Sequence, residues 1–206
     1  MQSESPPVAR PATFTDWMRA QFKGVLDAVG GFCNRAGISP NTMTLLGLAG
    51  STLGAVMLAL GAIPLGGWVI LLSGVTDAID GTMARLRGKT TRFGAFLDST
   101  SDRFSELFLF GALALHFALT SNPAGVAAAF AAAIGSVMVS YEKARAEALG
   151  FECKVGLLTR MERYMVLCPL LVLNQPLIGA AAVAVLGNFT ALQRIWHVYR
   201  QARRDA

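Results

Sequence analysis

Apolar residues occupy long blocks of the chain, and short links containing glycine, proline or polar residues separate the blocks. A helix needs about 20 residues to cross a hydrocarbon core about 30 Å thick. The blocks reach this length only when their polar ends are counted, so we expect those ends to line a cavity rather than face lipid. The pattern predicts six membrane-spanning helices, over residues 41–63, 66–86, 91–119, 123–149, 157–173 and 176–200.

The stretch before these blocks, residues 14–36, has a different pattern. Its apolar side chains recur at helical spacing, and charged side chains alternate with them. This favours a juxtamembrane amphipathic helix lying on the membrane surface, although a helix packed on the aqueous side of the bundle would show the same pattern. The apolar positions are Phe14, Trp17, Met18, Phe22, Val25 and Leu26, and the charged positions are Asp16, Arg19, Lys23 and Asp27.

The two ends of the chain are polar. Residues 1–13 contain three prolines and no apolar core, which predicts a disordered start without a signal peptide. Ser39 and Pro40 open the first block as a helix cap and a first helical residue. We therefore expect one six-helix domain over residues 37–202, followed by a short tail over 203–206.

Composition supports this assignment. Hydrophobic residues make up 53% of the 206 residues and charged residues only 15%, and the mean hydropathy is positive. A soluble domain has about 25% charged residues, so the chain is predicted to be an all-α integral membrane protein. Cys33, Cys153 and Cys168 lack the spacing of a metal site and are expected to be small hydrophobic residues of the membrane or its interface.

Charge is distributed unevenly along the chain. The links at 61–67, 119–125 and 173–178 contain no charged residue, whereas the basic residues lie in the N-terminal region, in 85–103, in 143–163 and near the C-terminus. Because positive loops mark the cytoplasmic side, we expect both termini and the active face there, in a multi-pass protein of the plasma membrane. A net charge of +5 could indicate a nucleic-acid-binding protein, but the placement of the basic residues argues against it. Basic residues on one face favour phosphate-bearing substrates or anionic lipid.

Four aspartates stand in the stretch from Thr76 to Glu106. Asp77 and Asp80 are three residues apart and Asp98 and Asp102 four apart, so each pair lies on one face of a helix. The short basic link 86–89 would bring the two pairs together. Carboxylates at membrane depth are costly unless something compensates them, and clustered carboxylate oxygens suit Mg²⁺, Ca²⁺ or Mn²⁺. The spacing predicts a site for two divalent ions that clamp a phosphoryl group.

Small and basic residues share these faces. Gly81 and Ala84 leave a hollow beside the carboxylates, and Arg85 lies one turn further on, where it can hold a phosphate. A second basic set closes the cytoplasmic ends of the last three helices and suits a phosphate monoester, although the positive-inside rule alone would also place cations there. This set is Lys143, Arg145, Arg160, Arg163 and Arg194.

The aspartate stretch matches the signature D-x2-D-G-x2-A-R-x8-G-x3-D-x3-D, from Asp77 to Asp102. With it, nearly the whole chain resembles the CDP-alcohol phosphotransferase family. The resemblance implies transfer of a phosphatidyl group from CDP-diacylglycerol to an alcohol, with release of CMP, by a homodimer. It implies that Mg²⁺ (two ions, with Mn²⁺ possible) is held by Asp77, Asp80, Asp98 and Asp102, that Asp102 is the general base, and that the donor contacts Asn41, Thr42, Gly81, Arg85 and Thr91.

Two further segments, LDSTSDR at 97–103 and YEKARAE at 141–147, are similar to the phosphatidylinositol-phosphate synthase branch, as is G-x-x-x-R-x-E-R at 156–163. The chain departs from that branch at Thr159 and Met161. The resemblance implies inositol 1-phosphate as the acceptor, a phosphorylated polyol, with its phosphate held by the second basic set. Glycerol 3-phosphate, serine and free inositol remain alternative acceptors. A cation transporter is a remote alternative. A transporter would carry its acidic residues near mid-membrane, whereas the four aspartates here are expected near one face.

Overall fold

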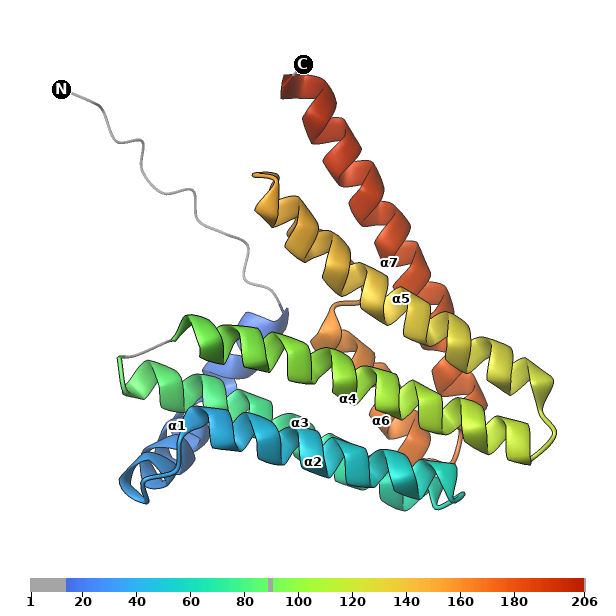
Figure 1. The fold of residues 1–206 in the computed structure, drawn as a ribbon, viewed down its shortest axis with the longest axis horizontal. Helices are drawn as coiled ribbons and strands as arrows, with labels where there is room; N and C mark the ends of the chain where they lie inside the picture. The colour runs from blue at the N-terminus through green and yellow to red at the C-terminus, as the bar shows by residue number, and fades with distance from the viewer. Residues whose placement is uncertain (1–13, 89–90, 206) are drawn as a thin grey trace.

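The computed structural model describes residues 14–88 and 91–205, and the side chains of 14–20, 22 and 205 are outside the description. The predicted disordered start, Lys89 and Ala206 therefore lie outside the described residues. Within them the regular secondary structure is all α-helix, without strands (Figure 1). The helices are α1 (Phe14–Arg35), α2 (Pro40–Ala59), α3 (Ile63–Leu86), α4 (Arg92–Leu119), α5 (Pro123–Ala148), α6 (Arg160–Val172) and α7 (Pro176–Asp205).

Local sequence explains several helix boundaries. The Ser39 side chain accepts a hydrogen bond from the Thr42 amide at the start of α2, and Pro40 is the first helical residue, as predicted. Asn122 caps α5 in the same way, accepting from the amide of Gly125 at 2.9 Å. Gly61 closes the α2–α3 link with a φ of 85°, a left-handed conformation that glycine adopts without steric cost.

The helices form one continuous bundle. Helix α2 packs against α3 and α4, α4 packs against α5, and α5 lies along α7. Helix α6 connects the two parts by packing against both α3 and α7, and α1 covers α3 (Figure 1). Leu58, Ile70, Leu113 and Leu171, from four different helices, are fully buried in the shared apolar core.

Small residues allow α2 and α3 to approach closely. Gly47, Gly50 and Gly54 all face α3, and a Cβ at Gly54 would lie 2.6 Å from Cγ1 of Ile70. A Cβ at Gly47 would collide with the hydroxyl of Thr76, which is next to Asp77. This glycine stripe therefore packs two helices of the same chain and brings the start of α2 beside the aspartates.

Four of the described helices are long and apolar enough to cross a membrane: α2, α3, α5 and residues 176–204 of α7. Helix α4 has sufficient length, at 28 residues, but is charged in its first half. Helix α6 has only 13 residues and begins at Arg160, three residues later than predicted. The preceding segment is irregular because side chains bond its backbone: Gln201 donates to the Glu152 carbonyl and Arg194 to the Val155 carbonyl.

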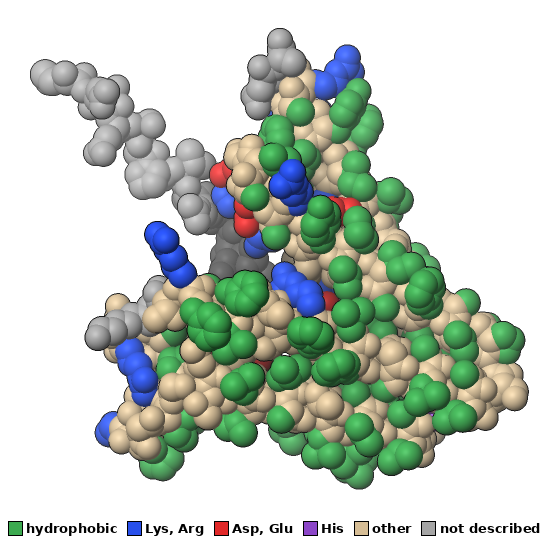
Figure 2. Space-filling model, in the orientation of Figure 1, with side chains coloured by type: hydrophobic (Ala, Val, Ile, Leu, Met, Phe, Trp, Pro, Cys, Tyr) green, Lys and Arg blue, Asp and Glu red, His purple; other side chains and the backbone are tan. Residues whose placement is uncertain are grey.

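Apolar and charged side chains occupy different parts of the surface. In Figure 2, hydrophobic side chains are spread across the visible face, and Lys and Arg gather on the half that carries the start of α4 and the ends of α5 and α7. Large apolar residues such as Leu53, Leu72 and Phe130 are at least half exposed. Exposed apolar area on this scale is typical of a surface in contact with lipid, so the protein is a multi-pass membrane protein.

Candidate active site

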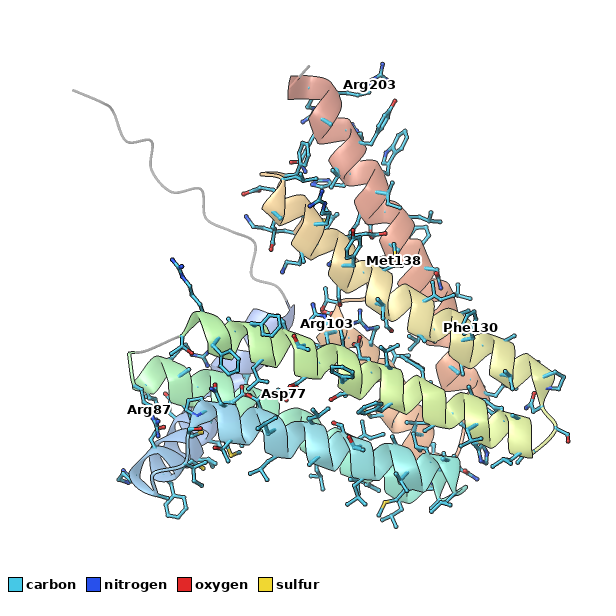
Figure 3. All side chains as sticks on the ribbon, in the orientation of Figure 1. Asp77, Arg87, Arg103, Phe130, Met138 and Arg203 are labelled. Carbon is cyan, nitrogen blue, oxygen red and sulfur yellow. The ribbon has the colours of Figure 1, made fainter. Side chains whose placement is uncertain are left out.

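The four aspartates come together where α3 ends and α4 begins. Asp77 and Asp80 lie on α3, and Asp98 and Asp102 on α4. Asp98 is close enough to interact electrostatically with each of the other three carboxylates. Figure 3 shows Asp77 within the helix bundle. The turn between the helices therefore places both pairs at one end of the bundle.

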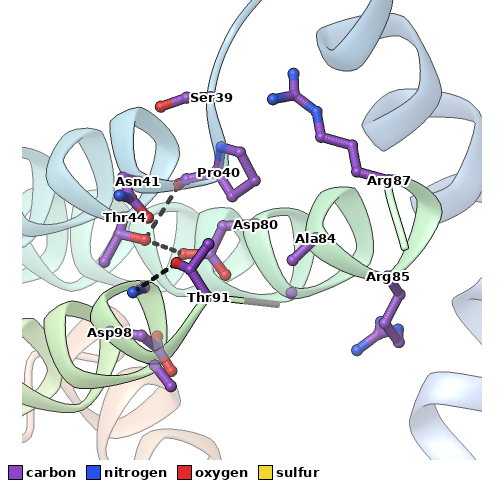
Figure 4. A pocket seen from close by; sticks show the side chains of 13 residues that line it. Ser39, Pro40, Asn41, Thr44, Asp80, Ala84, Arg85, Arg87, Thr91 and Asp98 are labelled. Atoms are coloured by element: carbon purple, nitrogen blue, oxygen red, sulfur yellow. Dashed lines mark hydrogen bonds between the residues drawn. The ribbon is translucent and has the colours of Figure 1, made fainter. Parts of the chain in front are cut away.

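Asp80 and Asp98 face a cavity of about 470 Å³ between α2, α3 and α4 (Figure 4). The buried Thr44 hydroxyl donates a hydrogen bond of 2.6 Å to Oδ2 of Asp80 and so orients that carboxylate. The wall of the cavity combines small, hydroxyl and basic residues. Its lining is Ser39, Pro40, Asn41, Thr44, Asp80, Gly81, Ala84, Arg85, Arg87, Thr91, Gly94, Ala95 and Asp98.

Most of the predicted donor-binding residues line this cavity, namely Asn41, Gly81, Arg85 and Thr91. Thr42 does not, because its amide and hydroxyl both contact the Ser39 side chain at the cap of α2. Thr91 has a capping role as well, since its hydroxyl accepts from the Gly94 amide at 2.9 Å. The starts of α2 and α4 therefore both contribute to the wall of the cavity.

Thr44 and Arg87 line the cavity, and sequence reasoning did not assign them to the site. Arg87 donates hydrogen bonds of 2.6 Å to Oδ1 of Asn34 and to the Ile38 carbonyl, so it fastens the end of α1 to the edge of the cavity. No sequence pattern indicates that partnership. Thr44 has a detectable signal, because it stands three residues before Gly47 on the small-residue face of α2 that packs against α3.

The other two aspartates, Asp77 and Asp102, face away from this cavity toward α6. Arg160 bridges them: Nη2 lies 2.5 Å from Oδ2 of Asp77, and Nη1 lies 2.6 Å from Oδ1 of Asp102. Its guanidinium also lies over the ring of Tyr164, 5.4 Å from the centroid. The aspartate group thus has a cavity side and an arginine side, and only a rigid, planar cation can bridge two carboxylates in this way.

The other four basic residues of the predicted set are placed differently from Arg160. Lys143 and Arg145 are exposed at the end of α5. Arg163 is 2% exposed and pairs with Glu106, and Arg194 is 4% exposed and donates to the carbonyls of Val139 and Val155. In this structure, Arg160 is therefore the member of the set that reaches the aspartates.

The aspartates offer only carboxylate oxygens, the ligands that Mg²⁺ and Mn²⁺ prefer, so the donor set suits such ions. Among the described residues, however, no three His, Cys, Asp or Glu side chains are already arranged around a common ion position. The orientation of the carboxylates gives the reason. Asp77 and Asp102 turn toward Arg160, and Asp80 turns toward Thr44.

Residues 37–194 match the CDP-alcohol phosphatidyltransferase family, and the chain belongs to this family of phospholipid-synthesising enzymes. It is 42% identical over 164 residues to the phosphatidylinositol phosphate synthase of Streptomyces avermitilis, which covers 78% of this chain and 67% of the relative. The match to this family confirms the resemblance that the aspartate signature indicated.

Two solved structures are similar, both of the phosphatidylinositol phosphate synthase of Mycobacterium tuberculosis. One has CDP-DAG bound, with a TM-score of 0.78 and 31% identity over 85% of this chain and 94% of that one. The other is a complex with manganese and citrate, with a TM-score of 0.79 and 31% identity over 84% of this chain and 88% of that one. The likeness extends over most of the bundle.

Proposed function

We propose that this enzyme transfers a phosphatidyl group from CDP-diacylglycerol to a hydroxyl of inositol 1-phosphate, giving phosphatidylinositol phosphate and CMP. The observation that carries the proposal is the two-sided aspartate group, with a cavity of about 470 Å³ on one side and Arg160 on the other. A transferase of this kind needs a nucleotide site and a phosphate site that meet at one reacting phosphorus. The names of the relatives support inositol phosphate as the acceptor.

On the donor side, we propose that the CDP group occupies the cavity and the acyl chains remain in lipid. Gly81 lines the cavity without a side chain and so leaves room for the nucleotide beside Arg85, whose Nη1 would be in ordinary contact with a Cβ at this position, at 3.5 Å. Arg85 is exposed at the mouth of the cavity and is suited to a phosphate. Asn41 and Thr91 offer polar side chains from the opposite wall, and Thr42 supports that wall through the cap of α2.

The proposed metal site consists of Asp77, Asp80, Asp98 and Asp102 and holds two Mg²⁺ ions, or Mn²⁺. When bound, such ions would neutralise the charge that develops on the leaving phosphate. Asp80 is already oriented by its hydrogen bond from Thr44. Asp77 and Asp102 form ion pairs with Arg160. Arg160 and a bound metal ion would therefore contact the same two carboxylates.

On the acceptor side, we propose that Arg160, Lys143 and Arg145 contact the phosphate of inositol 1-phosphate. Direct contact with Arg163 or Arg194, also in the predicted set, requires either residue to exchange its present protein partners. An acceptor held by Arg160 has its hydroxyls near Asp102. Asp102 takes the proton as the hydroxyl oxygen bonds to the β-phosphorus, and the bond from that phosphorus to the CMP oxygen breaks.

We further propose that α4 and α6 also cross the membrane, which gives six spans within a domain of residues 37–202. One charged residue of each helix is enclosed by the bundle, Glu106 at 3% and Arg163 at 2% exposed, which lowers the cost of placing these two at membrane depth. Both termini and the active site then lie on the cytoplasmic side of the plasma membrane, with α1 on its surface. The proposed assembly is a homodimer.

The deciding experiment supplies the purified protein with labelled CDP-diacylglycerol, Mg²⁺ and a panel of acceptors, and measures CMP. We expect release with inositol 1-phosphate well above that with glycerol 3-phosphate, serine or free inositol. Faster release with glycerol 3-phosphate would reassign the acceptor. Absence of CMP with every acceptor would refute the transferase proposal.

Replacing Thr44 with valine is expected to weaken metal binding, because it removes the hydrogen bond that orients Asp80 without changing side-chain size. Loss of a group that orients a metal ligand typically lowers affinity about 10- to 100-fold. The dissociation constant of Mn²⁺, measured by calorimetry on the purified protein, should rise by about this factor, and the Mg²⁺ concentration for half-maximal CMP release should rise with it.

Thr52→Val is the matched control, since the Thr52 hydroxyl, on the same helix, donates to the Leu48 carbonyl at 2.8 Å and not to an aspartate of the described site. Thr44→Ser, which retains the hydroxyl, should restore metal affinity. Wild-type affinity in Thr44→Val would show that Asp80 needs no such support.

A further inference from the structure

Helices α4 and α6 carry paired charges that face each other in two successive layers. Asp102 and Glu106 are one turn apart on α4, and Arg160 and Arg163 are one turn apart on α6. Asp102 pairs with Arg160, and Glu106 pairs with Arg163. Among the described helices, α4 and α6 are not a closely packed pair, so long arginine side chains span the space between them.

The deeper of the two layers is almost completely enclosed. Glu106 is 3% and Arg163 2% exposed. Both Nε and Nη2 of Arg163 donate to Oε1 of Glu106, at 3.1 and 2.5 Å. These two charge-assisted bonds converge on one carboxylate oxygen and hold the guanidinium against it. Because the pair is removed from water, it is also little screened by salt.

The same arginine holds the segment that leads into α6. Nη1 of Arg163 donates to the Leu158 carbonyl at 3.2 Å. The Leu158 amide, in turn, donates to the hydroxyl of Thr190 on α7 at 3.1 Å. Arg160 begins α6 two residues after Leu158. The place of Arg160 is therefore set by a chain of contacts that starts at Glu106 and passes through Arg163.

We propose that Glu106 is a positioning residue of the acceptor site. Through Arg163 it holds the first turn of α6 against α4, which keeps the Arg160 guanidinium between Asp77 and Asp102. The proposal rests on the acceptor role given to Arg160 above. It gives a role to a buried charge pair that lies outside the aspartate signature and whose two members do not line the cavity.

The test compares Glu106→Gln with the double variant Glu106→Gln/Arg163→Met, which leaves no unpaired charge in the interior and is therefore expected to fold. In both, the KM for inositol 1-phosphate should rise about 10- to 100-fold while the KM for CDP-diacylglycerol changes less than about twofold, since small misplacements of a binding group are costly. Amide hydrogen exchange of residues 158–163 should become faster.

Asn188→Ala is the control for a loss of packing alone. Asn188 donates to the Ala131 carbonyl at 2.9 Å and so joins α5 to α7 away from the aspartates. It should reduce thermal stability without separating the two KM values. Glu106→Asp, which retains the charge, should recover part of the affinity for the acceptor.

An unchanged KM for inositol 1-phosphate in the folded double variant would overturn the proposal, as would unchanged exchange at 158–163. Failure of the proposed function is distinguishable, because the wild-type protein would then release no CMP with any acceptor. The exchange measurement needs no turnover and still decides whether Glu106 holds the start of α6.

Discussion

Asp102→Asn is expected to lower kcat by at least about 10³-fold, in the upper part of the range for loss of a general base. The amide keeps the size of the side chain but accepts no proton at neutral pH. It also weakens the contact with Nη1 of Arg160, 2.6 Å away. CMP release in a single turnover, with donor and acceptor both saturating, measures the chemical step directly.

Asp27→Asn on α1 is a matched control, since it makes the same change of carboxylate to amide outside the aspartate stretch. Circular dichroism and thermal unfolding should show that Asp102→Asn retains the fold, and the variant should still bind CDP-diacylglycerol. Turnover at the wild-type rate would remove Asp102 from the role of base.

Arg160→Met is expected to lower kcat/KM for inositol 1-phosphate by about 10²-fold or more, because loss of one partner from a desolvated charge pair costs about 2–5 kcal/mol and about 1.4 kcal/mol corresponds to a factor of ten. Methionine keeps much of the apolar stem while removing the guanidinium that bridges Asp77 and Asp102. Steady-state rates with inositol 1-phosphate and with free inositol provide the comparison, and the loss should be far smaller with free inositol.

Arg160→Lys tests geometry at constant charge. An ammonium group is a point charge and cannot bridge two carboxylates as a planar guanidinium does, so the lysine variant should recover only part of the activity. An equal loss with the phosphorylated and the free acceptor would argue against a phosphate contact at Arg160. Arg160 would then be assigned to the donor side of the site.

Much of the bundle follows from local sequence. The Ser39–Pro40 start of α2 and the Asn122–Pro123 start of α5 depend on interactions within a few residues, and both appear in the structure. The glycine stripe of α2 faces a neighbouring helix, as its spacing indicates. These features were predictable because caps and helical faces require no knowledge of distant partners.

The fifth predicted span, over residues 157–173, starts three residues too early, since α6 begins at Arg160. Residues 157–159 are apolar enough to extend a helix, but the Leu158 amide and carbonyl bond to Thr190 and Arg163 instead. The segment around 149–159 is held by α7, more than 30 residues later in the chain. Competition of this kind between helix formation and distant side-chain partners leaves no periodic signal in the local sequence.

Within the candidate site, the spacing of Asp77, Asp80, Asp98 and Asp102 was enough by itself to predict two carboxylate pairs on two helical faces, because helical geometry converts spacing into direction. Only the tertiary structure decided which way each pair faces. Asp80 bonds to Thr44 of α2, whereas Asp77 and Asp102 bond to Arg160 of α6. An arginine side chain is long and flexible, so its partner depends on how helices far apart in sequence pack together. The same reason explains why the tertiary structure was needed to connect Glu106, absent from the signature, to the site through Arg163.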